Sequence, residues 1–245
     1  MIAIFKKELT SFFGSVLGYI VVAVFLIITG LFLFVFPETD YNIFDYGYAS
    51  LDGLFNLAPW VFMFLLPAVT MRMISEEISG GTIEFLATRP VTDLQIVLAK
   101  YFAALALLLF SILPSLVYYY TVYQLGAVTG NIDTGAALGS YLGLFLLGSC
   151  FAAIGLFASS LTSNQVVAFL ISVFLCFFFY SGFKNISQLP FFYGRTDDII
   201  QSIGIDAHFA SIRRGVVDFR DVFYFISLSG IFIFLTKTSL SSRKW

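Results

Sequence analysis

Residues 72–100 read RMISEEISGGTIEFLATRPVTDLQIVLAK and form the longest polar interval in the first half of the chain, with an apolar run on either side. The first residues of this interval suit a helix that carries two adjacent carboxylates, Glu76 and Glu77. Gly80 and Gly81 then interrupt the helix, because glycine is a poor helix former. We therefore predict a break in the helical backbone at the two glycines.

Two possible helix starts follow this break. Thr82 can cap a new turn, and Glu84 lies close enough to its start to interact favourably with the positive end of the helix dipole. Thr92 or Asp93 can cap the helix that enters the next apolar run. The segment 72–95 thus predicts two short helices on a membrane surface.

The composition assigns the chain to the membrane. Apolar residues make up 59% of it and charged residues 11%, whereas roughly a quarter of the residues of a soluble domain are charged. Cys150 and Cys176 lie in apolar runs without a redox or metal partner near them in the sequence, so we interpret both as packing residues. The sequence predicts an all-α polytopic membrane protein.

The uncharged runs are long enough for helices of about 20 residues that cross a bilayer. Residues 134–183 hold no charge and are too many for one span, and the polar break at 159–165 divides them. We predict one membrane domain over residues 1–245 with six spans, at about 17–36, 53–71, 97–121, 138–159, 166–183 and 222–237. The sixth run has few uncharged residues, so a protein with five spans is the alternative.

The remaining segments lie outside these spans. Residues 2–16 place Phe5, Leu9 and Phe12 on one helical face, which predicts an interfacial helix or, alternatively, a polar extension of the first span. The first apolar run is too long for a cleavable signal peptide, so we expect it to stay as a span. The outer loop 184–221 contains apolar patches that predict short helices resting on the outer membrane surface.

The basic residues predict that the N-terminus and the C-terminus are both cytoplasmic, because loops on that side are enriched in Lys and Arg. Eight basic residues favour this orientation, and five in the loop 184–221 oppose it. Those that favour it are Lys6, Lys7, Arg72, Arg89, Lys100, Lys237, Arg243 and Lys244.

Two features of the spans leave alternatives open. Pro67 and Pro114 lie within spans and predict kinks, which either shape the helices or act as gating hinges. Small residues at four-residue steps, such as Gly148 and Ala152 or Gly155 and Ser159, let helix backbones approach closely. They serve either packing within the chain or contact with a second copy.

The polar interval 72–100 resembles the cytoplasmic coupling segment of ABC-2-type exporter permeases. The resemblance lies in a series of features along the chain: an acidic pair, Gly-Thr, an acidic residue, Leu, Arg-Pro and then Lys at the mouth of a span. The resemblance is densest over residues 76–100. It implies that this segment docks on a separate ATPase subunit. It also implies that the ATPase subunit uses ATP and that this chain itself binds no cofactor. The docking residues that it implies are Glu76, Glu77, Gly80, Gly81, Thr82 and Glu84.

Within this family, the residues MIAIFKKELTSFF (1–13) and IDAHFASIRRGVVDFRDVFYF (205–225) are similar to the permease subunit of gliding-motility-associated ABC transporters. The resemblance implies a bacterial inner-membrane exporter with a second permease copy or a larger gliding-associated membrane subunit as partner. Membrane lipid is expected to surround the chain, and nucleic acid is not expected to bind it.

Other functions have weaker support. The peptide 78–82 matches the Ser-Gly-Gly signature of ABC ATPases, but the chain has no GxxxxGK[ST] phosphate loop, so we expect no ATPase site. His208 is the single histidine, and no metal site is predicted. An ion-coupled secondary transporter or channel is the main alternative, although such proteins commonly carry charges within their spans. A scaffolding protein would leave the acidic segment unexplained.

Overall fold

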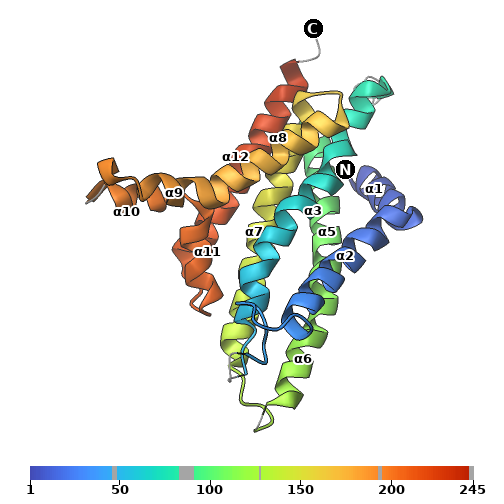
Figure 1. Cartoon of the computed structure of the whole chain (residues 1–245). Coiled ribbons are helices and arrows are strands. Elements are labelled where there is room, and N and C mark those ends of the chain that lie inside the picture. The colour runs from blue at the N-terminus through green and yellow to red at the C-terminus, as the bar shows by residue number, and fades with distance from the viewer. Residues whose placement is uncertain (46–48, 83–90, 127, 193–194, 243–245) are drawn as a thin grey trace.

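The computed structural model describes residues 1–45, 49–82, 91–126, 128–192 and 195–242, and within these ranges every regular element is a helix. Figure 1 shows a bundle of long helices with α9, α10 and α11 on one side. The α-helices are α1 Ile2–Gly14, α2 Val16–Phe34, α3 Asp52–Ser79, α5 Asp93–Ile112, α6 Leu116–Leu125, α7 Thr134–Leu161, α8 Gln165–Phe177, α9 Phe183–Ser187, α10 Arg195–Gln201, α11 Ile205–Arg213 and α12 Phe219–Ser242.

Six helical segments are long and apolar enough to cross a membrane, which confirms the predicted all-α fold with six spans. The sixth of them, α12, has 24 residues, so the described chain favours six spans over five. The segments are Val16–Phe34, Asp52–Ser79, Asp93–Leu125, Thr134–Leu161, Gln165–Ser187 and Phe219–Ser242.

The second span differs from the prediction at its end. Residues 72–79, expected as a separate short helix, continue α3, which has 28 residues and is therefore about 42 Å long. A bilayer core is about 30 Å thick, so the last turns of α3 extend beyond it. Charged side chains end an apolar run without ending a helix, because Arg72, Glu76 and Glu77 are compatible with helical backbone.

The two proline sites have different local structures. Pro67 lies inside α3, which continues through it. Pro114 lies in a 3-10 turn, Leu113–Ser115, that joins α5 to α6 within the third span. Tyr141 of α7 donates a hydrogen bond to the backbone carbonyl of Ser115 (3.0 Å), which ties this turn to the core. A hinge function of either proline stays a prediction.

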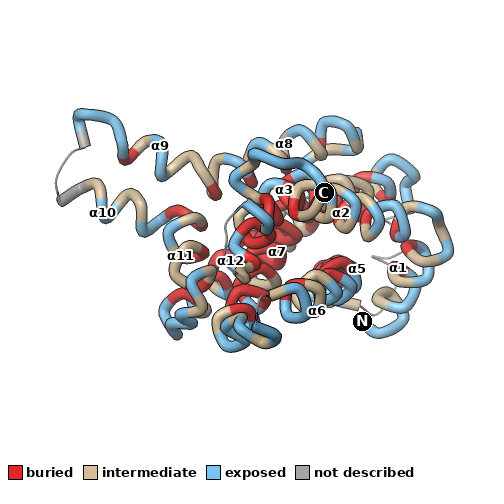
Figure 2. The backbone as a smooth tube through the Cα atoms, turned by 60° about the horizontal axis from the view of Figure 1, so that its bottom comes forward, coloured by how far each residue is buried: buried red, intermediate tan, exposed pale blue. Residues whose placement is uncertain are grey.

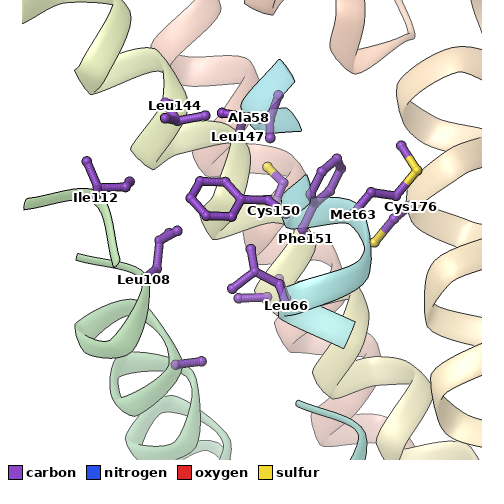
Figure 3. Packing of buried hydrophobic residues seen from close by; sticks show 14 of the residues in the cluster. Ala58, Met63, Leu66, Leu108, Ile112, Leu144, Leu147, Cys150, Phe151 and Cys176 are labelled. Carbon is purple, nitrogen blue, oxygen red and sulfur yellow. The ribbon is translucent and has the colours of Figure 1, made fainter. Parts of the chain in front are cut away.

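The central helix of the bundle is α7, which packs against α3, α5, α8, α11 and α12. Its buried residues lie in the middle of the molecule in Figure 2. Figure 3 shows the side chains that meet around it: Leu144, Leu147, Cys150 and Phe151 of α7, Ala58, Met63 and Leu66 of α3, Leu108 and Ile112 of α5, and Cys176 of α8. Both cysteines are free and buried, as expected for packing residues.

The small residues of α7 serve packing within this chain. A methyl group at Gly155 would overlap the hydroxyl of Thr70 in α3, and one at Gly148 would press on Leu108 in α5. The Ser159 hydroxyl donates to the Met71 carbonyl of α3 (2.8 Å) and accepts from the backbone N–H of Ser75 (3.0 Å). These contacts assign Gly148 and Gly155 to packing within the chain, and contact with a second copy stays a prediction.

The described residues between α8 and α12 contain short helices, as expected, and one of them, α11, packs on the bundle. A π-helix, Phe178–Gly182, joins α8 to α9, and α10 and α11 follow. Ile205, Phe209 and Ile212 of α11 are fully buried, and α11 packs against α7. Part of the predicted outer loop therefore contributes to the core, because its apolar residues recur at the spacing of one helical face.

Candidate functional site

The end of α3 carries the predicted docking residues. Glu76 is exposed, whereas Glu77 is buried at 8% exposure. Gly80 caps the helix, and its N–H donates to the Glu76 carbonyl (2.9 Å). Gly81 has a φ of +66°, a left-handed conformation that favours glycine, so the predicted break at the two glycines is present.

The remaining predicted docking residues lie just beyond the helix. The Thr82 hydroxyl donates to the Glu77 carbonyl (3.3 Å) and folds back onto the last turn of α3. Glu84 lies outside the described residues. The exposed residues at this end are Glu76, Ser79, Gly80, Gly81 and Thr82, which we call the α3 terminal surface.

Directly beneath this surface lies a lysine that is almost completely buried. The Lys100 side chain is 1% exposed, and its Nζ lies 2.8 Å from Glu8 Oε1 and 2.9 Å from Glu77 Oε2. Nζ also donates to the backbone carbonyl of Met73 (2.6 Å). Glu8 and Met73 accept hydrogen bonds from Lys100 Nζ. Glu77 Oε2 lies outside the direction of a hydrogen bond from Nζ, so Lys100 and Glu77 interact through their charges.

A second lysine completes this arrangement from the solvent side. Lys7 of α1 donates to Glu77 Oε1 (3.0 Å) and lies 3.9 Å from Glu8 Oε1. Burial lowers the pKa of Lys7, but the hydrogen bond and charge of Glu77, together with the charges of Glu8 and Glu76, outweigh it and raise the pKa overall. Lys7, Glu8, Glu77 and Lys100 form what we call the Lys100 cluster.

The Lys100 cluster joins three helices that are distant in the sequence. Its members come from α1, from the last turns of α3 and from the first turns of α5. It holds two cations and two carboxylates, so its formal charge is zero. A buried charge is tolerated when it is paired, and removing one partner typically costs about 3–5 kcal/mol. A displacement of α3 is therefore opposed by charge pairs to both α1 and α5.

The start of α5 explains how Lys100 reaches this position. Thr92, one of the two predicted caps, accepts a hydrogen bond from the Gln95 backbone N–H (3.4 Å), and the Gln95 side chain accepts one from the Thr92 N–H (3.3 Å). This capping box sets where α5 begins. Lys100 then lies about two turns into the helix, on the side that faces α1 and α3.

Sequence reasoning missed three members of this cluster. Lys7 and Lys100 were expected as cytoplasmic charges, with Lys100 at the mouth of a span, and Glu8 was not selected as a candidate. One signal for Glu8 is its position three residues after Phe5 and four residues before Phe12, on the apolar face of α1. A carboxylate on an apolar helical face requires a buried partner, which here is Lys100.

The α3 terminal surface and the Lys100 cluster offer charge pairs and an exposed turn. The described residues contain no group of three or more His, Cys, Asp or Glu side chains placed to hold a metal ion. The site combines an exposed turn, a carboxylate at Glu76 and a buried charge network that ties the turn to two other helices. It is suited to binding a protein surface and to passing a displacement to the spans.

Comparison with known proteins identifies a family. The family model described as ABC-2 family transporter protein matches residues 38–205, which include the helices from α3 to α10. No curated protein matches the chain significantly. Permeases of this kind are membrane components that typically pair with an ATPase subunit. Because the match covers more than half of this multi-pass membrane protein, the chain belongs to the ABC-2 transporter family.

Proposed function

We propose that this chain is the permease subunit of an ATP-driven ABC-2 exporter and that the α3 terminal surface docks on the ATPase subunit. The observation that carries this proposal is the Lys100 cluster directly beneath an exposed turn. The family match supports the permease assignment. ATP is bound and hydrolysed by the partner, and this chain supplies the pathway.

The two adjacent carboxylates take different roles in this proposal. Glu76 is exposed and meets a basic residue of the ATPase, whereas Glu77 is held by Lys100 and Lys7 and connects the docked turn to α1 and α5. Gly80, Gly81 and Thr82 supply the turn that the ATPase contacts. Movement of the turn is passed through charge pairs to α1, which precedes the first span, and to α5 in the third span.

We also propose a cellular setting, on the basis of the distribution of basic residues and of the family resemblance. Both termini lie in the cytoplasm of a bacterium, the chain spans the inner membrane, and two permease subunits form the pathway, with the partner either a second copy or a larger gliding-associated subunit. The role in gliding motility rests on the resemblance of residues 1–13 and 205–225, and the family match adds nothing to it. Loss of gliding on deletion, restored by the intact gene, is the observation that this role requires.

The docking proposal is tested by purifying the native complex through a tag on this chain. Glu76→Lys reverses an exposed charge and is expected to remove the ATPase from the purified complex while the permease stays folded. The matched control is Asp198→Lys, which reverses an exposed charge in α10 and is expected to retain the ATPase. If Glu76→Lys retains the ATPase as fully as the wild type, the assignment of Glu76 to the interface is wrong.

An ion-coupled transporter remains the second candidate because Lys100 and Glu77 are buried ionisable groups in helices that span the membrane. Such groups mark ion or proton pathways in many transporters. Here they lie at the ends of their spans and neutralise each other, which favours a structural link. Ion flux through the purified chain in liposomes without any ATPase would favour the second candidate instead.

A further inference from the structure

A polar cavity lies near the beginning of α3, far from the α3 terminal surface. Its walls come from α3, from the π-helix and α9, and from α11, together with residues 40 and 41. Its volume is about 310 Å³. We call it the α3–α11 cavity. Asn56 on its wall precedes Gly80 by 24 positions, which corresponds to about 36 Å along a helix.

The cavity contains a guanidinium with unused donors. Arg213 Nη1 donates to the side-chain oxygen of Asn56, and this is the single hydrogen bond of the Arg213 side chain among the described residues. A guanidinium has five N–H donors in a planar fork that matches the oxygens of phosphate and carboxylate groups. The other Arg213 donors are thus available to an oxyanion in the cavity.

Next to Arg213 lies an ion pair that a ligand can open. Lys184 Nζ lies 2.7 Å from Asp206 Oδ2, with the lysine side chain 54% and the aspartate side chain 19% exposed. Exposed pairs of this kind contribute little to stability, about 0–1 kcal/mol. A ligand that carries both charges can replace each partner with its own group at small cost.

The cavity as a whole is balanced in charge and has aromatic walls. Two carboxylates, Asp40 and Asp206, accompany two cations, Lys184 and Arg213. Trp60 is 39% exposed and packs edge-on against Tyr180 with ring centroids 5.6 Å apart. An indole beside a carboxylate attracts ammonium groups through its π-system. A ligand with one anionic and one cationic group matches this lining better than a simple anion does.

The volume of the α3–α11 cavity and its position along α3 restrict the class of ligand that it can bind. The volume lies at the lower end of the range of about 300–1,000 Å³ for small-molecule sites, so the cavity fits a headgroup rather than a whole lipid. Trp60 lies eight residues into α3, which is about 12 Å from the helix start, and tryptophan is enriched where the bilayer core meets the headgroups. The π-helix that carries Tyr180 and Ser181 is a rare element that often marks functional sites.

We propose that the α3–α11 cavity binds a zwitterionic phosphate–ammonium group, with the phosphate on Arg213 and Lys184 and the ammonium on Asp206 and Trp60. The headgroup of phosphatidylethanolamine in the surrounding membrane supplies this chemistry, as does a soluble zwitterion such as phosphoethanolamine. The proposal does not depend on the docking of an ATPase, because the cavity lies at the other end of α3.

The test uses the full chain in nanodiscs that contain equal amounts of phosphatidylethanolamine and phosphatidylglycerol, followed by native mass spectrometry of the retained lipids. The wild type is expected to retain phosphatidylethanolamine preferentially. Arg213→Gln is expected to retain about tenfold less of it, the effect of losing one charged hydrogen bond. Asp206→Asn is expected to lose the preference over phosphatidylglycerol, because the ammonium then lacks its counter-charge.

The matched control is Arg214→Gln, which removes an exposed neighbouring arginine that does not line this cavity and is expected to retain lipid as the wild type does. Lys184→Gln is a second variant for the case that Arg213→Gln does not fold. It changes a mostly exposed side chain and removes the other cation that is proposed to hold the phosphate. A second arm measures binding of soluble phosphoethanolamine to the same variants.

The two arms separate the sources of the ligand. Selective retention of phosphatidylethanolamine that depends on Arg213 or Lys184 supports the proposal with lipid as the source. Binding of phosphoethanolamine with the same dependence, but without lipid selectivity, supports it with a soluble source. Equal results for Arg213→Gln, Lys184→Gln and Arg214→Gln in both arms overturn it.

Discussion

At the scale of single residues, Lys100 differs most from its expected role. Lysine near the end of a span is normally counted as a cytoplasmic charge that sets orientation. Here the ammonium is enclosed by Glu8, Glu77 and the Met73 carbonyl, and the side chain is almost inaccessible. Lys100 therefore holds α5 against α1 and α3.

Lys100→Met is expected to destabilise the fold by about 3–5 kcal/mol, because Glu8 and Glu77 then share Lys7 as their remaining cation among the described residues. The measurement is the free energy of unfolding in mixed detergent micelles. Lys6→Met, which removes an exposed charge of α1, serves as the control and is expected to change it by less than about 0.5 kcal/mol.

A double variant separates the pairing from the loss of lysine packing. Lys100→Met combined with Glu77→Gln is expected to be more stable than the sum of the two single effects predicts, because the two residues are in contact. Strict additivity of the two changes would contradict direct charge pairing between Lys100 and Glu77.

A second prediction at this scale concerns Gly81. Its backbone conformation requires glycine, whereas its surroundings leave room for a side chain. No heavy atom lies within 4 Å of an added Cβ, but φ is +66°. Gly81→Ala is expected to destabilise the turn by about 1 kcal/mol. Gly230→Ala in α12 is an informative control, since its added Cβ also meets nothing and its helical backbone should become slightly more stable.

At the scale of elements, the close contact between α3 and α7 depends on Gly155 and Thr70. Gly155→Ala is expected to cost about 1–3 kcal/mol, because the methyl group meets the Thr70 hydroxyl and the helices must separate. Thr70→Ala in the same chain removes the obstructing group and is expected to restore part of the loss. Equal destabilisation by Gly155→Ala in both backgrounds would contradict the assignment of Thr70 as the group that the added methyl meets.

Helices were easier to predict than their junctions. Each of the six spans overlaps its predicted uncharged run, because hydrophobicity and length are properties of a continuous segment. The ends differ where polar residues continue the helix, as in residues 72–79 of α3. That α1 lies in the membrane interface stays a prediction, although its helix is present and Ser15 separates it from α2 with extended backbone.

At the scale of the whole molecule, an even number of spans places the two chain ends on the same side of the membrane. The expected result is that Lys6→Cys and Ser241→Cys react with an impermeant maleimide from one side of sealed vesicles and Asp198→Cys from the other. Cys150 and Cys176 are buried and should contribute little background. Labelling of Lys6→Cys and Ser241→Cys from opposite sides would contradict the six-span arrangement.

The amino-acid sequence by itself determined the class of this protein, the number and approximate place of its spans, the helix break at Gly80 and Gly81, and the resemblance to its family. All of these depend on composition, on continuous runs or on local backbone preferences. The tertiary structure alone decided which of two adjacent carboxylates is exposed, that Lys100 is buried, and that Asn56, Lys184, Asp206 and Arg213 share one cavity. Burial and pairing of charges depend on contacts between helices far apart in the chain, and no local pattern specifies those contacts.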